Sequence, residues 1–279
     1  MRVALRRAAH QVHDAQPLVF EDPLAVAILP RDTRAELDRT PDATRRPFSA
    51  ALRAFMVARA RFAEDVLRAS VERGEAAQYL VLGAGLDTFA YRNPFPTVRV
   101  FEVDHPATQA WKRQCLVAAA IAIPANAVLV SVDFERDALA ERLLAAGFSL
   151  QAPTVVAWLG VVPYLTGEAF DATVRVLASF APGSELVFDY SYPRELLPPV
   201  EQLMHESMSA RVAQAGEPFR LFFTVEDLRH RLASQDIDVL ENLGSAELNA
   251  RYFSERSDDL RLRGSAGHLC HARVSRQLG

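Results

Sequence analysis

From residue 78 onward, short apolar runs alternate with stretches of helical periodicity, and this alternation limits the possible folds more than any other feature of the chain. Continuous apolar strands separated by helices are typical of a parallel sheet that is covered on both faces. The expected strands are residues 79–82, 98–103, 128–132, 154–159, 185–188, 238–243 and 268–274. The sequence therefore predicts an α/β fold with a doubly wound, mostly parallel, Rossmann-like sheet.

The first 77 residues lack such strands and are expected to form a helical N-terminal cap. Apolar residues recur at helical spacing between Phe48 and Glu72, and Gly74 provides a stop signal. Residues Pro23–Ile28 predict a shorter helix with proline at its start. Residues 78–279 would then form the sheet domain, with a helical lid inserted around 191–220.

Composition limits the binding partners and the cellular compartment that we expect for the chain. Half of the residues are hydrophobic, 24% are charged and the net charge is −4, which argues against a broad surface for nucleic acid. Two cysteines make no disulfide framework and fit a reducing compartment. The longest apolar run, Cys115–Val130, is interrupted by Pro124 and is too short to span a bilayer. We expect a cytoplasmic protein without nucleic-acid or membrane partners, and the oligomeric state stays open.

The segment Gly83-Ala84-Gly85 follows the first expected strand and precedes a helical stretch. Glycines let the backbone approach a ligand closely, and the start of a helix offers unpaired N–H groups. Ligands of open α/β sheets bind at the carboxyl ends of the strands. The segment therefore predicts a nucleotide-cofactor site.

Two cofactor classes compete for this segment. A dinucleotide fold prefers a third glycine at position 88, where this chain has Thr88. S-adenosylmethionine has no pyrophosphate and needs only a tight polar turn, so the missing glycine favours it. Glu102 and Asp104 lie at the end of the second strand, with Asp104 closer to its exit. Either carboxylate suits a ribose, but a salt bridge for Glu102 and a helix N-cap for Asp104 are the alternatives.

Asp133 and Phe134 repeat this pattern at the end of the third strand. The carboxylate can accept a hydrogen bond from an adenine amino group while the ring packs on the purine. An acidic N-cap followed by a core phenylalanine would explain the pair equally well. Acidic residues at the ends of the two strands that follow one G-x-G turn are better explained, taken together, by an adenosyl ligand than by separate structural roles.

Taken together, these strings resemble the leucine carboxyl methyltransferase family of class I S-adenosylmethionine-dependent methyltransferases, in its bacterial small-protein branch. The resemblance extends from Arg7 to about Tyr190. It is carried by Phe20–Ala25, Ala58–Phe62 with Asp65, Leu82–Thr88 with Tyr91–Arg92, Phe101–Pro106 and Trp158–Leu165. It implies methyl transfer with S-adenosylmethionine as cofactor.

The resemblance also implies roles for individual residues. Gly83, Ala84 and Gly85 would line the amino-acid end of the cofactor, and Arg59 would pair with its carboxylate. Asp104, followed by His105, would hold the ribose. The adenine would contact Asp133 and Phe134.

Two further positions bear on the amino-acid end of the cofactor. Arg7 resembles a basic residue that some members of the family use near the cofactor. Many members have a glutamate where this chain has Leu159, a side chain that cannot accept a hydrogen bond from the methionyl amine. Another group must then accept that hydrogen bond.

Methyl transfer from a sulfonium mainly requires alignment and exclusion of water. A carboxylate acceptor needs no base, whereas a hydroxyl acceptor benefits from a base with a pKa near 7. We expect Tyr164 and Tyr190 to line the acceptor pocket and His205, in the lid, to be a candidate base. His10 and His13 have a possible metal spacing but no third ligand, so no metal site is predicted.

The sequence thus predicts an S-adenosylmethionine-dependent O-methyltransferase acting on a small-molecule carboxylate or hydroxyl. One alternative is an NAD(P)-dependent oxidoreductase on a Rossmann-like fold. The other is a protein that binds S-adenosylmethionine without catalysis.

Overall fold

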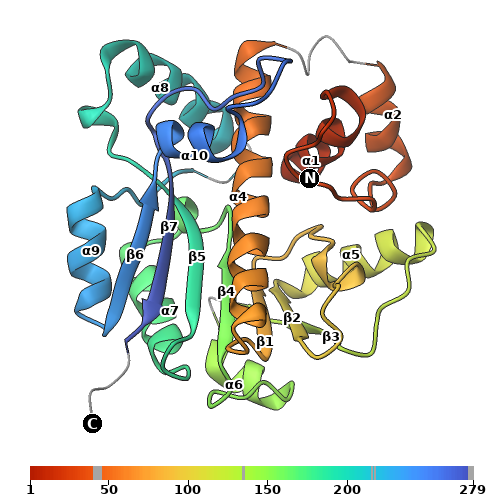
Figure 1. Cartoon of the computed structure of the whole chain (residues 1–279), viewed down its shortest axis with the longest axis vertical. Coiled ribbons are helices and arrows are strands. Elements are labelled where there is room, and N and C mark those ends of the chain that lie inside the picture. Colours follow the sequence, from red (N-terminus) through yellow and green to blue (C-terminus); the bar gives the residue numbers. More distant parts are fainter. Residues whose placement is uncertain (40–45, 134–135, 215, 217, 276–279) are drawn as a thin grey trace.

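The computed structural model describes residues 1–39, 46–133, 136–214, 216 and 218–275. Within these residues a seven-stranded sheet has the order β3-β2-β1-β4-β5-β7-β6 (Figure 1). The strands are β1 (Gln78–Leu82), β2 (Arg99–Asp104), β3 (Ala127–Ser131), β4 (Thr154–Trp158), β5 (Glu185–Ser191), β6 (Ile237–Leu243) and β7 (Gly267–Val274). Neighbours among β1–β5 pair in parallel and β7 is antiparallel to β5 and β6, which confirms the predicted fold class.

The winding of the chain reverses at β1, because β1 lies between β2 and β4. Such a reversal opens a crevice at the carboxyl ends of the central strands, where ligands of this architecture bind. The strand register aligns Leu82 with Val103 and Asp104 with Ser131. The ends of β1, β2 and β3 therefore meet at one edge of the sheet.

Helices cover both faces of the sheet. Long helix α4 (Pro47–Glu72) crosses one face together with α10 (Ser245–Tyr252), and its buried side chains pack on alternate residues of β1, β2, β4 and β5. The opposite face is covered by α6 (Leu139–Ala145), α7 (Gly167–Ala178) and α9 (Val225–Ala233). The other helical elements are α1 (Arg2–His13), α2 (Arg31–Arg39), α5 (Pro106–Ala118), α8 (Pro199–Gln214), η1 (Phe89–Tyr91), η2 (Val162–Tyr164) and η3 (Arg194–Leu196).

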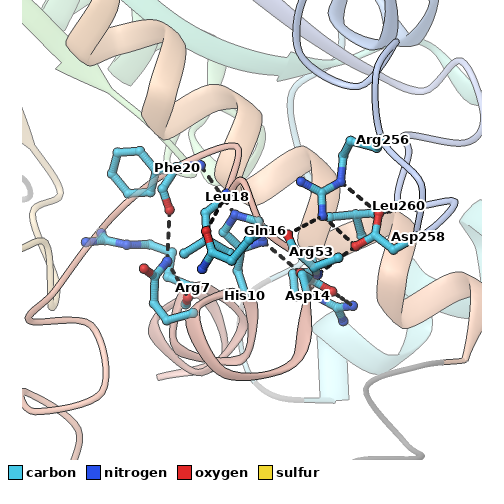
Figure 2. A network of polar contacts seen from close by, with 12 residues as sticks. Arg7, His10, Asp14, Gln16, Leu18, Phe20, Arg53, Arg256, Asp258 and Leu260 are labelled. Atoms are coloured by element: carbon cyan, nitrogen blue, oxygen red, sulfur yellow. Dashed lines mark hydrogen bonds and ion pairs between the residues drawn. The ribbon is translucent and has the colours of Figure 1, made fainter.

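Residues 1–39, called the N-terminal cover here, include α1 and α2 and lie beside α4 (Figure 1). Figure 2 shows how the end of α1 is fastened. The carboxylate of Asp14 accepts hydrogen bonds from Arg53 of α4 at 2.6 and 2.7 Å and lies 2.7 Å from His10 Nδ1. In the α10–β7 connection, Arg256 donates to the carbonyls of Ala15 and Pro17, and Asp258 accepts from the Ala15 N–H. The cover is therefore held by two elements, α4 and the α10–β7 connection, which meet at residues 14–17.

Most predicted element positions are confirmed, with local exceptions. Gly74, with φ +72°, follows the end of α4 as expected. The predicted helix at Pro23–Ile28 is wrong: these residues form turns, in which the Ala25 N–H donates to the Asp22 carbonyl three residues back and Ile28 makes the one i→i−4 bond, to Leu24, which is too little for a helix. None of the helices in the described part of the chain is long and apolar enough to cross a membrane.

Candidate active site

The turn from Gly83 to Gly85 connects β1 to η1 at the carboxyl edge of the sheet. The N–H groups of Gly83 and Ala84 donate to the Val103 carbonyl, and the Gly85 N–H donates to Asp104 Oδ2 at 2.6 Å. Both glycines have positive φ, +70° and +49°. A Cβ at Gly83 would lie 2.4 Å from Cγ2 of Val161, whereas a Cβ at Gly85 would meet no atom within 4 Å. Gly83 is therefore required for packing, and Gly85 faces open space that a ligand can use.

Asp104, the last residue of β2, lies beside this turn. Its Oδ1 accepts from the His105 N–H at 2.7 Å, and its Oδ2 holds the Gly85 N–H. The N-cap of α5 is His105, whose Nδ1 accepts from the Ala107 N–H, so the alternative of an Asp104 cap is wrong. Each oxygen of Asp104 accepts one of these hydrogen bonds and retains a further lone pair, which suits a ribose hydroxyl.

Glu102, the other acidic candidate, is fully buried and already paired. Its Oε2 lies 2.7 Å from Nζ of Lys112 and accepts from the Tyr91 hydroxyl at 2.7 Å. Burial raises the pKa of Glu102, although Lys112 opposes the shift. The salt-bridge interpretation of Glu102 is therefore the correct one, and it also explains how the only lysine of the chain is used.

Arg7 of α1 is buried against the residues that follow the glycine turn. It donates to Asp87 Oδ2 at 2.9 Å and to Thr88 Oγ1 at 2.8 Å, and it also pairs with Asp22. Burial opposes its charge, but Asp87 and Asp22 outweigh that effect and raise the pKa of Arg7. Arg7 thus ties α1 to the turn and is committed to these carboxylates.

The neighbouring Arg6 is half-buried, and a different set of charged groups acts on it. Burial and the positive charges of Arg2, Arg59 and Arg53 lower the pKa of Arg6, while Tyr164 opposes this shift. Within the described ranges no carboxylate forms an ion pair with Arg6, and its only hydrogen bond goes to the Arg2 carbonyl at 3.4 Å. Arg6 therefore leaves a positive charge available at the carboxyl edge of the sheet.

Arg59 reaches the same edge from α4 and is 4% exposed. Its Nη1 donates to Asp189 Oδ2 at 2.7 Å, and Asp189 Oδ1 accepts from the Gly160 N–H at 2.5 Å. A Cβ at Gly160 would lie only 2.7 Å from Arg59 Nη2, so the guanidinium packs directly on this backbone. Asp189 and Gly160 could not be predicted from the sequence, because the packing of α4 against the ends of β4 and β5, and no local motif, brings them to Arg59.

Four aromatic side chains, called the aromatic group here, gather where α8 meets the carboxyl edge of the sheet: Tyr164, His205, Phe219 and Phe222. The ring of Tyr164 lies 5.3 Å from that of Phe219, and His205 lies 5.9 Å from Phe219 and 5.8 Å from Phe222. The segment that carries both phenylalanines is fixed at the carboxyl edge, because the Arg220 N–H donates to the Pro163 carbonyl. The aromatic group therefore adjoins the end of β4.

His205 is the titratable member of this aromatic group. The residue is 5% exposed, its Nδ1 lies 3.3 Å from Ser209 Oγ, and its buried Nε2 has no partner among the described residues. Burial and then the charge of Arg194 lower the pKa of His205. The imidazole is therefore neutral at pH 7 and can accept a proton.

The other predicted site residues are placed as follows. Tyr190 is buried, and its hydroxyl accepts from Asn242 at 2.8 Å while its ring stacks on His268. Asp133 is partly exposed and lies 3.7 Å from Arg136, whereas Phe134 falls outside the described residues. Leu159, just past β4, packs against the apolar cluster under α4. Their roles toward a cofactor or acceptor stay predictions.

Comparisons with solved structures agree with the observed architecture. A methyltransferase structure from Thermobifida fusca matches with a TM-score of 0.59 at 18% identity, covering 93% of this chain and 97% of that one. A DUF574 family protein from Streptomyces avermitilis also gives 0.59 at 18% identity, covering 88% and 94%. At these identities the matches show the fold alone.

Sequence comparison is more specific. The profile of the leucine carboxyl methyltransferase family matches residues 1–178. YktD of Bacillus subtilis, named as an S-adenosyl-L-methionine-dependent methyltransferase, is 37% identical over 207 residues, covering 73% of this chain and 67% of that protein. Franean1_4929 of Parafrankia, named likewise, is 38% identical over 142 residues, but the match spans only 44% of its length and 50% of this chain. The chain belongs to the leucine carboxyl methyltransferase family and is an S-adenosylmethionine-dependent methyltransferase.

Proposed function

We propose that the protein transfers a methyl group to an oxygen atom, a hydroxyl or a carboxylate, of a small molecule. One juxtaposition carries the cofactor half of this proposal: the open face of Gly85, the Asp104 carboxylate and the uncompensated charge of Arg6 lie at one edge of the sheet. An adenosyl ligand with an amino-acid end has a group for each of these. A pyrophosphate fits less well, because Thr88 is buried and its hydroxyl is bound by Arg7.

Each residue would act on a different part of the cofactor. Arg6 and Arg59 would bind the methionyl carboxylate, since guanidinium groups form strong charge-assisted hydrogen bonds with carboxylates. Asp104 would accept a hydrogen bond from the ribose, and Asp133 would accept one from the adenine amino group. The backbone at Gly85 would contact the ligand directly, because no side chain stands in the way.

When bound, S-adenosylmethionine supplies a methyl group on a positively charged sulfur, which leaves as a neutral thioether. The rings of Tyr164, Phe219 and Phe222 would exclude water from the acceptor side. His205 Nε2 would accept the proton of a hydroxyl acceptor, because the imidazole is neutral at pH 7 and Nδ1 faces Ser209. A carboxylate acceptor would need no proton transfer.

A product screen tests the proposal. The protein is incubated with S-adenosylmethionine and separate panels of phenols, alcohols, carboxylic acids, amines and thiols, and methylated products are detected by mass spectrometry. We expect products from oxygen acceptors only. H205A should reduce methylation of hydroxyl acceptors roughly 100-fold or more, as expected for loss of a general base, and should leave carboxylate acceptors unaffected.

The matched control is H230A, because His230 lies on the exposed part of α9 and contacts none of these groups. Methylation confined to nitrogen or sulfur acceptors would overturn the assignment to oxygen. Calorimetric titration with S-adenosylhomocysteine and, separately, with NAD tests the alternative of an NAD(P)-dependent oxidoreductase. Only S-adenosylhomocysteine should bind.

A further inference from the structure

Asp189 occupies the strand position next to Leu159. Trp158 of β4 is aligned with Phe188 of β5 in a parallel pair, so residues 159 and 189 follow side by side and face the same side of the sheet. Leu159 packs against the cluster that also contains Val187, which places that side under α4. A carboxylate is thus present one strand away from the apolar side chain of Leu159.

The Asp189 carboxylate is buried but not saturated with hydrogen bonds. The residue is 4% exposed, one oxygen accepts from Arg59 and the other from the Gly160 N–H. An ionised carboxylate offers about four lone-pair sites. Each oxygen can therefore accept one more hydrogen bond without releasing its present partner.

The charges at this point match a zwitterion. Arg6 contributes a positive charge without an ion-pair partner in the described part of the chain, and the charge of Arg59, which is itself paired with Asp189, acts on Arg6. An α-amino acid carries a carboxylate and an ammonium on adjacent atoms, so the first can meet the two arginines while the second meets Asp189. A purely anionic ligand would instead be repelled by Asp189.

We propose that Asp189 binds the α-ammonium group of the cofactor, replacing from β5 a contact that Leu159 cannot make from the end of β4. The proposal rests on the assignment of S-adenosylmethionine as cofactor. The alternative is that Asp189 only positions Arg59, in which case it would contribute equally to every ligand that Arg59 binds.

The test compares two ligands that differ in one group: S-adenosylhomocysteine and its analogue without the α-amino group. We expect the wild-type protein to bind S-adenosylhomocysteine roughly 10- to 100-fold more tightly, the range for a hydrogen bond to a charged group. In D189N the calorimetric affinities for the two ligands should come within about 3-fold of each other. The reason is that the neutral amide of this variant carries no charge to attract the ammonium and replaces one accepting oxygen by a donor.

The double variant D189N/L159E places a carboxylate on the neighbouring strand end, and it should restore the preference for S-adenosylhomocysteine. It also retains the net charge of the site, so it tests the proposal even if D189N alone does not fold. Equal weakening of both ligands in D189N, with the wild-type ratio preserved, would show that Asp189 only positions Arg59. A wild-type protein without preference between the ligands would overturn this inference alone, whereas one that binds neither would also overturn the cofactor site.

Discussion

At the scale of single residues, the two glycines of the β1 turn serve different purposes. Gly83 is fixed by a packing contact, since any Cβ would collide with Val161, and Gly85 has an open face. The sequence motif predicts both positions because the strand and the turn are local features. It does not separate their roles, because Val161 comes from the distant β4–η2 connection.

Replacing Gly85 by valine should abolish binding of S-adenosylhomocysteine. The new side chain would fill the open space that the ligand needs, while no protein atom lies there to be displaced. Calorimetry measures the binding, and far-UV circular dichroism should stay that of the wild type. G183V is the matched control, because Gly183 also has a positive φ, +88°, and no atom within 4 Å of its Cβ position. Wild-type affinity in G85V would mean that the cofactor binds elsewhere.

Replacing Arg6 by alanine should weaken S-adenosylhomocysteine binding by about 1.5–3 kcal/mol, the usual value of a hydrogen bond to a charged group. The thermal midpoint should change little, since Arg6 has no ion-pair partner in the described structure whose charge would be stranded. R2A on the exposed side of the same helix is the control. Equal affinities of R6A and R2A would contradict the assignment of Arg6.

Arg6 illustrates why part of the proposed site could not be predicted from the sequence. The resemblance points to Arg7, which the structure pairs with Asp87, whereas the charge of Arg59 acts on its neighbour Arg6. Which arginine meets which charge depends on how α1 packs against the rest of the molecule. Asp189 could not be predicted for a related reason, since the packing of α4 against the end of β5 brings it to Arg59.

At the scale of elements, the strands were predictable because buried parallel strands are continuously apolar. The turns at Pro23–Ile28 were not, because proline suits the start of a turn as well as the start of a helix, and here the Ala25 N–H donates to the Asp22 carbonyl three residues back. The contact between β2 and α5 depends on the buried pair Glu102 and Lys112. The contribution of this pair to the free energy of unfolding can be measured independently of cofactor binding.

Removing one member of the Glu102–Lys112 pair should lower the free energy of unfolding strongly. K112M leaves the Glu102 charge buried without its cation, and we expect a loss of about 3–5 kcal/mol in the free energy of unfolding. The double variant K112M/E102Q should recover most of it, because glutamine is neutral and can still accept from the Tyr91 hydroxyl. Urea unfolding followed by circular dichroism measures both. An equal loss in the two variants would show that packing, and not charge, dominates at this contact.

At the scale of the whole molecule, the N-terminal cover is held by carboxylates with lowered pKa values. Burial opposes ionisation of Asp258, but Arg256 and two backbone N–H groups outweigh it and lower its pKa to about 2. The pKa of Asp14 is lowered in the same sense by His10 and Arg53, against the effect of burial. Both carboxylates stabilise the folded state above the pKa of an unfolded aspartate, near 4.

Acid should therefore loosen the cover. Since the folded pKa values lie below the unfolded value, the stabilisation is complete above about pH 4 and is lost as the pH falls toward 2. The hydrogen-exchange protection factors of residues 1–39 should fall across this range before those of β1 and β4. D258N should exchange faster at pH 5 and show a smaller acid step. Unchanged protection of the cover down to pH 2 would contradict this account.

The link from Arg7 to Asp87 has a thermodynamic consequence for the cover. Detaching α1 would pull on the backbone that follows Gly85 and would remove Arg6 at the same time, so the detached form cannot hold the cofactor in the proposed way. Occupancy must then oppose detachment: ligand at 100 times its Kd shifts that opening equilibrium by about 2.7 kcal/mol. The hydrogen-exchange protection of α1 should therefore rise with the fraction of the protein whose nucleoside site is occupied.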